Sequence, residues 1–333
     1  MKKMISLARV GISLLLAVII CSLFCLAYSY NMLHITAPTG ASDLRDVPNS
    51  FCTNMIEGHG WIRIDANGYN NVEAYDSVDV LVMGGSHVQG LQVSQKENLT
   101  YRLDQYLQEM TVYNVGESGH PISTCVNNLD NACEAFSPSY VVMDINVSVF
   151  DMDDMKHVLN GTYPKPVLIS DHLIYRVIRN GIPAVAPIIL QLRKWVQSNE
   201  SEKNVNDTIG YNETAYGELL DRFLDYAEEV ADKHNCKLIF LYHPSHYSVN
   251  SKGILQYEDE SEALSILQTS CDNHNITLVN TKEENIRMYE EQRVLPNGFV
   301  NTSLGEGHLN RYGHEAAAKA LADAIMELER NAD

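Results

Sequence analysis

The sequence has few basic residues, with 24 lysines and arginines against 43 aspartates and glutamates, and its formal net charge is −19. After residue 10 it contains no basic cluster. A chain this acidic repels phosphate backbones, which argues against nucleic-acid binding. Its seven cysteines form no CxxC pair of the kind that binds zinc. The sequence also has no internal repeat, heptad or low-complexity tract, which excludes a solenoid or a coiled coil.

A basic and then apolar N-terminus sets the expected location. Lys2, Lys3 and Arg9 precede an almost unbroken apolar run of 18 residues from Val10 to Ala27, close to the ~20 residues that a membrane-spanning helix needs. Positive charge before such a run holds the N-terminus in the cytoplasm and exports the rest of the chain. Residues 1–29 are therefore predicted to be a signal anchor, which makes the protein a single-pass membrane protein with an extracytoplasmic C-terminal domain. Small residues at 27–29 leave secretion after signal cleavage open as the alternative.

The rest of the chain alternates short apolar runs with amphipathic segments. Residues 30–75 are turn-rich and are expected to form a membrane-proximal segment, and residues 76–330 a single domain. The alternation predicts βαβ units and a mainly parallel five-stranded sheet with helices on both faces. The expected strands are 79–84, 112–115, 140–146, 237–242 and 276–280, and the expected helices are 98–110, 216–234, 261–273 and one beginning at Gly313. Residues 151–215 lack strand character and are expected to form a cap insertion.

Polar residues that follow the predicted strands are the candidates for chemistry, because ligands bind at the carboxyl ends of strands in open parallel sheets. Ser86, Gly119 and Asn146 follow the first three strands in turn, and His308 lies on a glycine-rich loop ahead of the last helix. His308 can take the hydroxyl proton of Ser86 as a general base. Backbone N–H groups at Ser86 and Gly119, with the Asn146 amide, can stabilise an oxyanion. Taken singly, each residue also has a simpler explanation as a helix cap, a turn or a loop contact.

Four short blocks carry a resemblance to a known family. They are Met83-Gly-Gly-Ser-His-Val-Gln-Gly90, Asn114-Val-Gly-Glu-Ser-Gly119, Asp144-Ile-Asn146 and Gly307-His-Leu-Asn310. Their order resembles that of the four sequence blocks of the SGNH (GDSL-type) hydrolases, and residues 61–69 resemble the lead-in segment of some exported members. The resemblance implies a flavodoxin-like three-layer α/β/α fold and esterase or acyl-transfer chemistry that needs no metal or organic cofactor. By position it implies Ser86 as nucleophile, Gly119 and Asn146 as oxyanion donors, and His308 as base.

Three positions depart from the family pattern. Gly85 stands where the first block usually has Asp, and Asp144 where the third usually has Gly. Gly305 stands three residues before the histidine, where the last block usually has Asp. Glu306 then becomes the candidate for the orienting acid, or a backbone carbonyl orients the imidazole in a Ser-His dyad. Because the third member of a triad mainly fixes tautomer and orientation, its loss weakens catalysis without removing the mechanism.

The sequence as a whole predicts an extracytoplasmic serine esterase or O-acyltransferase that works through an acyl-enzyme. Its expected substrate is an ester-bearing cell-surface or secreted polysaccharide, an inference that rests on location alone. The membrane is expected as a partner through the N-terminal helix, and nucleic acid is not. The alternative is a catalytically inactive protein that keeps the fold to bind glycan or to scaffold envelope assembly, which the three departures favour.

Overall fold

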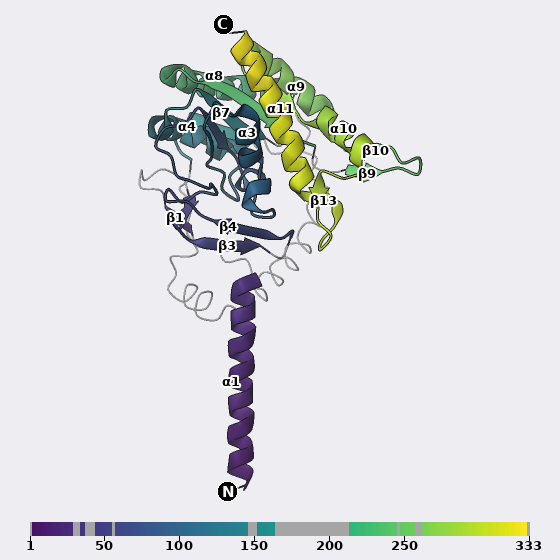
Figure 1. Ribbon diagram of the computed structural model, residues 1–333. Coiled ribbons are helices and arrows are strands. Elements are labelled where there is room, and N and C mark those ends of the chain that lie inside the picture. The colour runs from purple at the N-terminus through teal and green to yellow at the C-terminus, as the bar shows by residue number, and fades with distance from the viewer. Residues whose placement is uncertain are drawn as a thin grey trace.

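The computed structural model describes residues 2–28, 34–36, 44–54, 57–145, 152–163, 213–244, 247–257 and 261–331. Asn146 and most of the predicted cap at 151–215 lie outside these residues. Figure 1 shows a folded body from which one long helix, α1 (Lys2–Tyr28), projects.

Five parallel strands form the central sheet, in the order β11-β8-β7-β5-β6. Read from β6 and numbered along the chain, this order is 2-1-3-4-5, the flavodoxin-like arrangement. The strands are β5 (Val80–Met83), β6 (Val112–Asn114), β7 (Tyr140–Ile145), β8 (Lys237–Tyr242) and β11 (Thr277–Asn280). The predicted five-stranded parallel sheet is confirmed. Continuous apolar runs marked these strands because a sheet with helices on both faces buries both sides of each strand, and all four residues of β5 are buried.

Helices cover both faces of the sheet and form two separate apolar clusters with it. On one face, Leu129 and Phe223 belong to helices that pack against the side chains of Leu81, Val141 and Phe240. On the other face, helix residues pack against the opposite sides of the same strands. The first face is covered by α4 (Ile122–Phe136), α5 (Met152–Leu159), α8 (Glu213–His234) and α9 (Ser261–Asn273), and the second by α3 (Leu99–Leu107) and α11 (Arg311–Arg330). α10 (Lys282–Gln292) packs beside α11.

The last helix starts two residues earlier than the sequence predicts. Gly313 is the expected first residue, but α11 begins at Arg311. The Asn310 side chain accepts hydrogen bonds from the N–H groups of Tyr312 at 2.9 Å and Gly313 at 3.3 Å, and so acts as the N-cap. This cap fixes the helix start directly after strand β13 (Leu304–Leu309), which carries His308.

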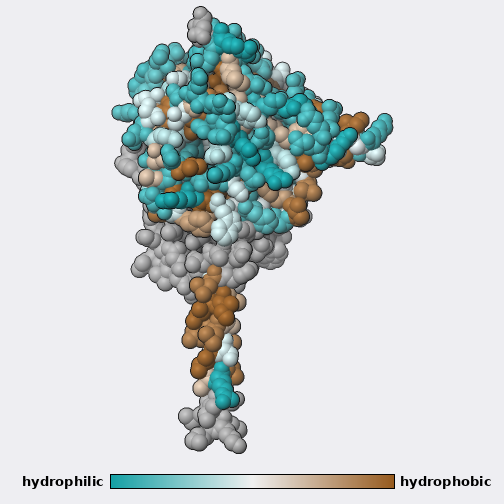
Figure 2. Space-filling view, in the orientation of Figure 1, coloured by the Kyte–Doolittle hydropathy of each residue, from teal (hydrophilic) through white to brown (hydrophobic). Residues whose placement is uncertain are grey.

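The N-terminal helix α1 lies where the sequence predicts a membrane anchor. Many of its large apolar side chains are exposed, and Figure 2 shows them as a brown column below the body. Ile20 is 64% exposed and Leu14 63%. In the part of the chain that the structure describes, no helix has both the length and the hydropathy needed to cross a membrane.

Small two-stranded sheets surround the central one. The hairpin of β3 (Phe51–Asn54) and β4 (Gly60–Arg63) packs against the loop that begins at Gly90, because Ile62, Ile64 and Leu91 share one apolar cluster. A Cβ atom on Gly60 would lie 1.8 Å from the Leu91 carbonyl oxygen, so this approach requires glycine. The other pairs are β1 (His34–Thr36) with β2 (Leu44–Asp46), β9 (Tyr247–Val249) with β10 (Leu255–Tyr257), and β12 (Asn297–Gly298) with β13.

Candidate active site

Ser86 is the first residue of α2 (Ser86–Gln89), a short helix that follows β5 after a Gly84-Gly85 turn. The turn is tight, since a Cβ atom on Gly84 would lie 2.5 Å from Val88 Cγ2 and 2.8 Å from the Asp144 Cβ. Gly85 is the N-cap of α2, and no side chain caps this helix. The simpler explanation of Ser86 as a capping residue is therefore wrong, and its hydroxyl is available for another partner.

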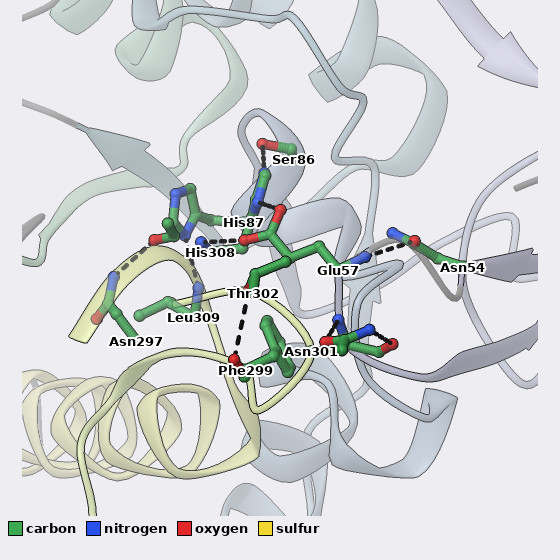
Figure 3. A network of polar contacts seen from close by, with 12 residues as sticks. Asn54, Glu57, Ser86, His87, Asn297, Phe299, Asn301, Thr302, His308 and Leu309 are labelled. Atoms are coloured by element: carbon green, nitrogen blue, oxygen red, sulfur yellow. Dashed lines mark hydrogen bonds and ion pairs between the residues drawn. The ribbon is translucent and has the colours of Figure 1, made fainter. Parts of the chain in front are cut away.

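That partner is His308, on strand β13. The Oγ atom of Ser86 lies 2.7 Å from Nε2 of His308 (Figure 3). The two residues are 222 positions apart in the chain. The fold brings them together because strand β13 contacts the short helix α2, which begins with Ser86. The structure thus places the predicted serine and histidine within hydrogen-bond distance of each other.

The carboxylate that orients His308 belongs to Glu57, which no pattern in the sequence indicates. Its Oε2 lies 2.8 Å from His308 Nδ1, and its Oε1 accepts a hydrogen bond of 3.1 Å from the His308 backbone N–H (Figure 3). A carboxylate only accepts hydrogen bonds, so the ring proton is on Nδ1 and Nε2 is free to accept from the Ser86 hydroxyl. The side chains of His308 and Glu57 are 26% and 18% exposed, so water screens their interaction only in part.

The prediction of Glu306 as the orienting acid is corrected by this geometry. Glu306 is exposed, whereas both carboxylate oxygens of Glu57 bond to His308. Gly307 leaves the room for this carboxylate, because a Cβ atom there would lie 2.5 Å from Glu57 Oε1. The family's usual Asp does not fit at position 305 either. Gly305 has φ of +85°, and a Cβ atom on it would lie 2.1 Å from the Tyr247 carbonyl oxygen.

Two further histidines lie near His308, since His87 packs against His308 and His243 packs against His87. The ring of His87 lies 5.0 Å from that of His308 and 4.6 Å from that of His243, between ring centroids. The Leu309 N–H donates to His87 Nδ1 over 3.3 Å. Burial, with a smaller contribution from His243 and His308, lowers the pKa of His87 well below its usual range, so the ring stays neutral. His308 therefore faces an uncharged neighbour that does not compete for the Glu57 carboxylate.

Asp144, an unusual residue for the third block, also has a partner. Its Oδ1 lies 3.0 Å from Nε2 of His243, and both side chains are buried, at 9% and 3% exposed. The Asp144 carboxylate is thus directed at His243, just after the C-terminal end of β8, and not at Ser86. Among the described residues, no group of three or more His, Cys, Asp or Glu side chains is arranged to hold a metal ion.

The predicted oxyanion loop lies beside the Ser86 turn. The Glu117 N–H donates to the Gly84 carbonyl oxygen over 2.9 Å, and a Cβ atom on Gly85 would lie 3.1 Å from the His120 carbonyl oxygen. Gly119, between these contacts, has φ of +88°, which favours glycine. The loops after β5 and β6 are therefore neighbours, as the resemblance implies. Asn146 lies outside the described residues.

Buried His314 makes the stability of this region depend on pH. Its Nδ1 accepts from the Leu99 N–H over 3.2 Å, and burial lowers its pKa from 6.5 to about 3. Between these two pH values the unfolded chain binds a proton that the folded protein excludes, so stability falls as the pH falls. We expect the loss between pH 7 and pH 5 to be ~2 kcal/mol smaller in His314→Gln than in the natural protein. Urea unfolding at both pH values measures it, and an equal loss in the two proteins would contradict it.

No protein-family model and no curated protein matches the chain. Solved structures that are similar to it include the acetyl xylan esterase AlAXEase, with 12% identity and a TM-score of 0.42 over 74% of this chain and 99% of that one. A catalytic mutant of the acetylxylan esterase Axe2 from Geobacillus stearothermophilus has 12% identity and a TM-score of 0.42, over 76% and 95% of the two chains. A lipolytic G-D-S-L protein from Veillonella parvula has 13% identity and a TM-score of 0.39, over 74% and 98%. The Veillonella parvula protein is named as a member of the lipolytic G-D-S-L family, the family that the four sequence blocks resemble.

Proposed function

We propose that this protein is a serine esterase or O-acyltransferase in which Ser86 is the nucleophile, His308 the general base and Glu57 the orienting carboxylate. The observation that carries the proposal is the continuous line of contacts from Ser86 Oγ to His308 Nε2 at 2.7 Å, and from His308 Nδ1 to Glu57 Oε2 at 2.8 Å. A serine bonded to a histidine that is bonded to a carboxylate has the geometry of an activated nucleophile.

The reaction follows from the protons in this line. As Ser86 Oγ attacks an ester carbonyl carbon, its proton moves to His308 Nε2, and the imidazolium is stabilised by the Glu57 carboxylate. The Ser86 and Gly119 N–H groups and the Asn146 amide are proposed to donate to the oxyanion. His308 then returns the proton to the leaving alcohol, which leaves an acyl group on Ser86. Water, or a second alcohol in a transferase, attacks this acyl-enzyme with His308 again as base.

The proposed substrate is an acylated cell-surface or secreted polysaccharide, outside the cytoplasm. Support comes from the exposed apolar side chains of α1, which favour an anchor that tethers the folded body at a membrane. The formal net charge of −19 suits a neutral or weakly charged glycan better than an anionic polymer.

Labelling of the full chain with a fluorophosphonate tests the chemistry without knowledge of the substrate. We expect one adduct, on the peptide that contains Ser86, because the reagent modifies serines activated by a neighbouring base. His308→Ala should lose the adduct while the protein stays folded. Mass spectrometry of the peptides locates it, and a folded natural protein with no adduct would favour the inactive glycan-binding alternative.

The same reagent tests the location when it is applied to intact cells that are then fractionated. The labelled protein is expected in the membrane pellet and to resist extraction by high salt, because an apolar helix holds it there. Recovery of the labelled, full-length protein in the soluble fraction would contradict the anchor and leave the chemistry intact.

A further inference from the structure

We propose that Asn301 is a positioning residue whose side-chain amide fixes the backbone of Gly58 and thereby holds the Glu57 carboxylate on His308. The inference rests on the proposed function, because it concerns the acid of the same site. The Gly58 N–H donates to Asn301 Oδ1 over 3.0 Å, and Asn301 Nδ2 donates to the Gly58 carbonyl oxygen over 3.1 Å. Figure 3 shows Asn301 directly beside the backbone that carries Glu57.

The reciprocal pair of hydrogen bonds constrains both the position and the rotation of residue 58. One amide side chain that bonds to the N–H and to the carbonyl of the same residue leaves its backbone little freedom to turn. Asparagine supplies the acceptor and the donor together, whereas aspartate supplies the acceptor alone. Asn301 and Gly58 are 243 positions apart, so this contact joins the turn of the β3–β4 hairpin to the loop between β12 and β13.

Gly58 lies in the turn of the β3–β4 hairpin, directly after Glu57, where the backbone packs closely against Gln92 and Phe299. Its φ is +74°, and a Cβ atom on it would lie 2.1 Å from the Gln92 carbonyl oxygen and 2.8 Å from Phe299 Cε1. The His59 N–H also donates to the Gln92 carbonyl oxygen, over 3.0 Å. On the other side of Glu57, its own N–H reaches Asn54 Oδ1 only over 3.4 Å. The two hydrogen bonds between Asn301 and Gly58 are therefore shorter than the hydrogen bond that the Glu57 N–H donates to Asn54.

Without Asn301, the hairpin tip has less to hold it against thermal motion, and the Glu57 side chain must give up rotamer freedom to reach His308. A displacement of about 1 Å is enough to stretch the 2.8 Å contact between Glu57 Oε2 and His308 Nδ1 beyond hydrogen-bond range. Displacements of this size lower catalytic rates by about 100-fold. The expected defect lies in kcat, because Asn301 acts on the orientation of His308 and not on the substrate.

The experiment compares Asn301→Ala and Asn301→Asp with the natural protein in hydrolysis of p-nitrophenyl acetate. We expect kcat to fall about 10- to 100-fold with KM unchanged. Combining Asn301→Ala with Glu57→Gln should lower kcat no further than Glu57→Gln alone, because both changes remove the same contact. Ser303→Ala is the matched control: it also destroys the Asn301-Thr302-Ser303 glycosylation sequon but leaves the amide in place, and it should retain full activity.

A second readout does not depend on turnover. A proton on His308 Nδ1 that is bonded to a carboxylate gives a low-field signal in the proton NMR spectrum, and we expect that signal in the natural protein and in Ser303→Ala. It should be lost or broadened in Glu57→Gln and in both Asn301 variants. Persistence of the signal in folded Asn301→Ala, or its absence from the natural protein, would overturn the positioning role. A natural protein that shows the signal but turns over no ester would overturn the proposed function alone.

Discussion

Replacing Ser86 by alanine is expected to lower ester turnover by about 10⁶-fold, to the level that binding and oxyanion contacts alone provide. The Ser86 Oγ is the atom that faces His308 Nε2, at 2.7 Å, and alanine offers nothing in its place. The hydroxyl caps no helix, so its removal should leave α2 and the free energy of unfolding nearly unchanged. A loss of activity in the alanine variant therefore reports chemistry and not folding.

The measurement is the steady-state hydrolysis of p-nitrophenyl acetate by the full chain, with circular dichroism and urea unfolding to verify the fold. Ser265→Ala is the matched control, since Ser265 is an exposed residue of α9 on the far side of the sheet from α11. This control should have the activity of the natural protein. Equal turnover by Ser86→Ala and the natural protein would remove Ser86 from the mechanism.

Replacing Glu57 by glutamine is expected to lower kcat by about 10³- to 10⁴-fold, with little change in KM. Glutamine keeps the size of the side chain but removes the negative charge that stabilises the imidazolium form of His308. It also allows the wrong tautomer, in which Nε2 carries the proton and cannot take one from Ser86. The fold should survive, because the backbone contacts of Gly58 with Asn301 do not involve the Glu57 side chain.

Glu306→Gln provides the sharpest comparison, since it makes the same chemical change at an exposed carboxylate two residues before His308. It should retain the activity of the natural protein. If Glu306 oriented His308, Glu306→Gln would lose activity and Glu57→Gln would retain it. The two variants together therefore distinguish the tertiary contact from the local one. Equal and small effects of both changes would indicate a Ser-His dyad without a carboxylate.

The departures from the family pattern have physical reasons in this fold. A Cβ atom at position 85 would lie 3.1 Å from the His120 carbonyl oxygen, which leaves little room for a side chain there. Gly305 has a φ of +85°, a backbone conformation that disfavours aspartate. Asp144 is buried against His243, and so it neither replaces the orienting acid nor contacts Ser86. In the sequence alone, all three positions favour the inactive alternative. With Glu57 on His308, the missing aspartate no longer implies a missing carboxylate.

Local patterns in the chain were enough to predict the central sheet and two of the three residues that line up at the site. Apolar runs such as Lys237–Tyr242 predict strands because burial on both faces demands them, and parallel strands place the residues that come after them at one edge. Ser86 could be predicted for that reason, whereas His308 was predicted from its place before the last helix and from the blocks that resemble those of the SGNH hydrolases. The predicted start of α11 at Gly313 was wrong by two residues, because the side chain of Asn310 caps the helix and α11 therefore begins at Arg311.

The identity of the orienting acid, in contrast, depends on tertiary packing. Glu57 is 251 positions from His308, in the turn of a short hairpin whose sequence does not indicate a contact with that histidine. Two glycines allow Glu57 to reach His308. Gly58 packs against the Gln92 carbonyl group, and Gly307 has no side chain that would occupy the space of the Glu57 carboxylate. A glycine in a sequence shows that a side chain is absent, but not which distant group fills the space. That information arises when two loops far apart in the chain pack against each other.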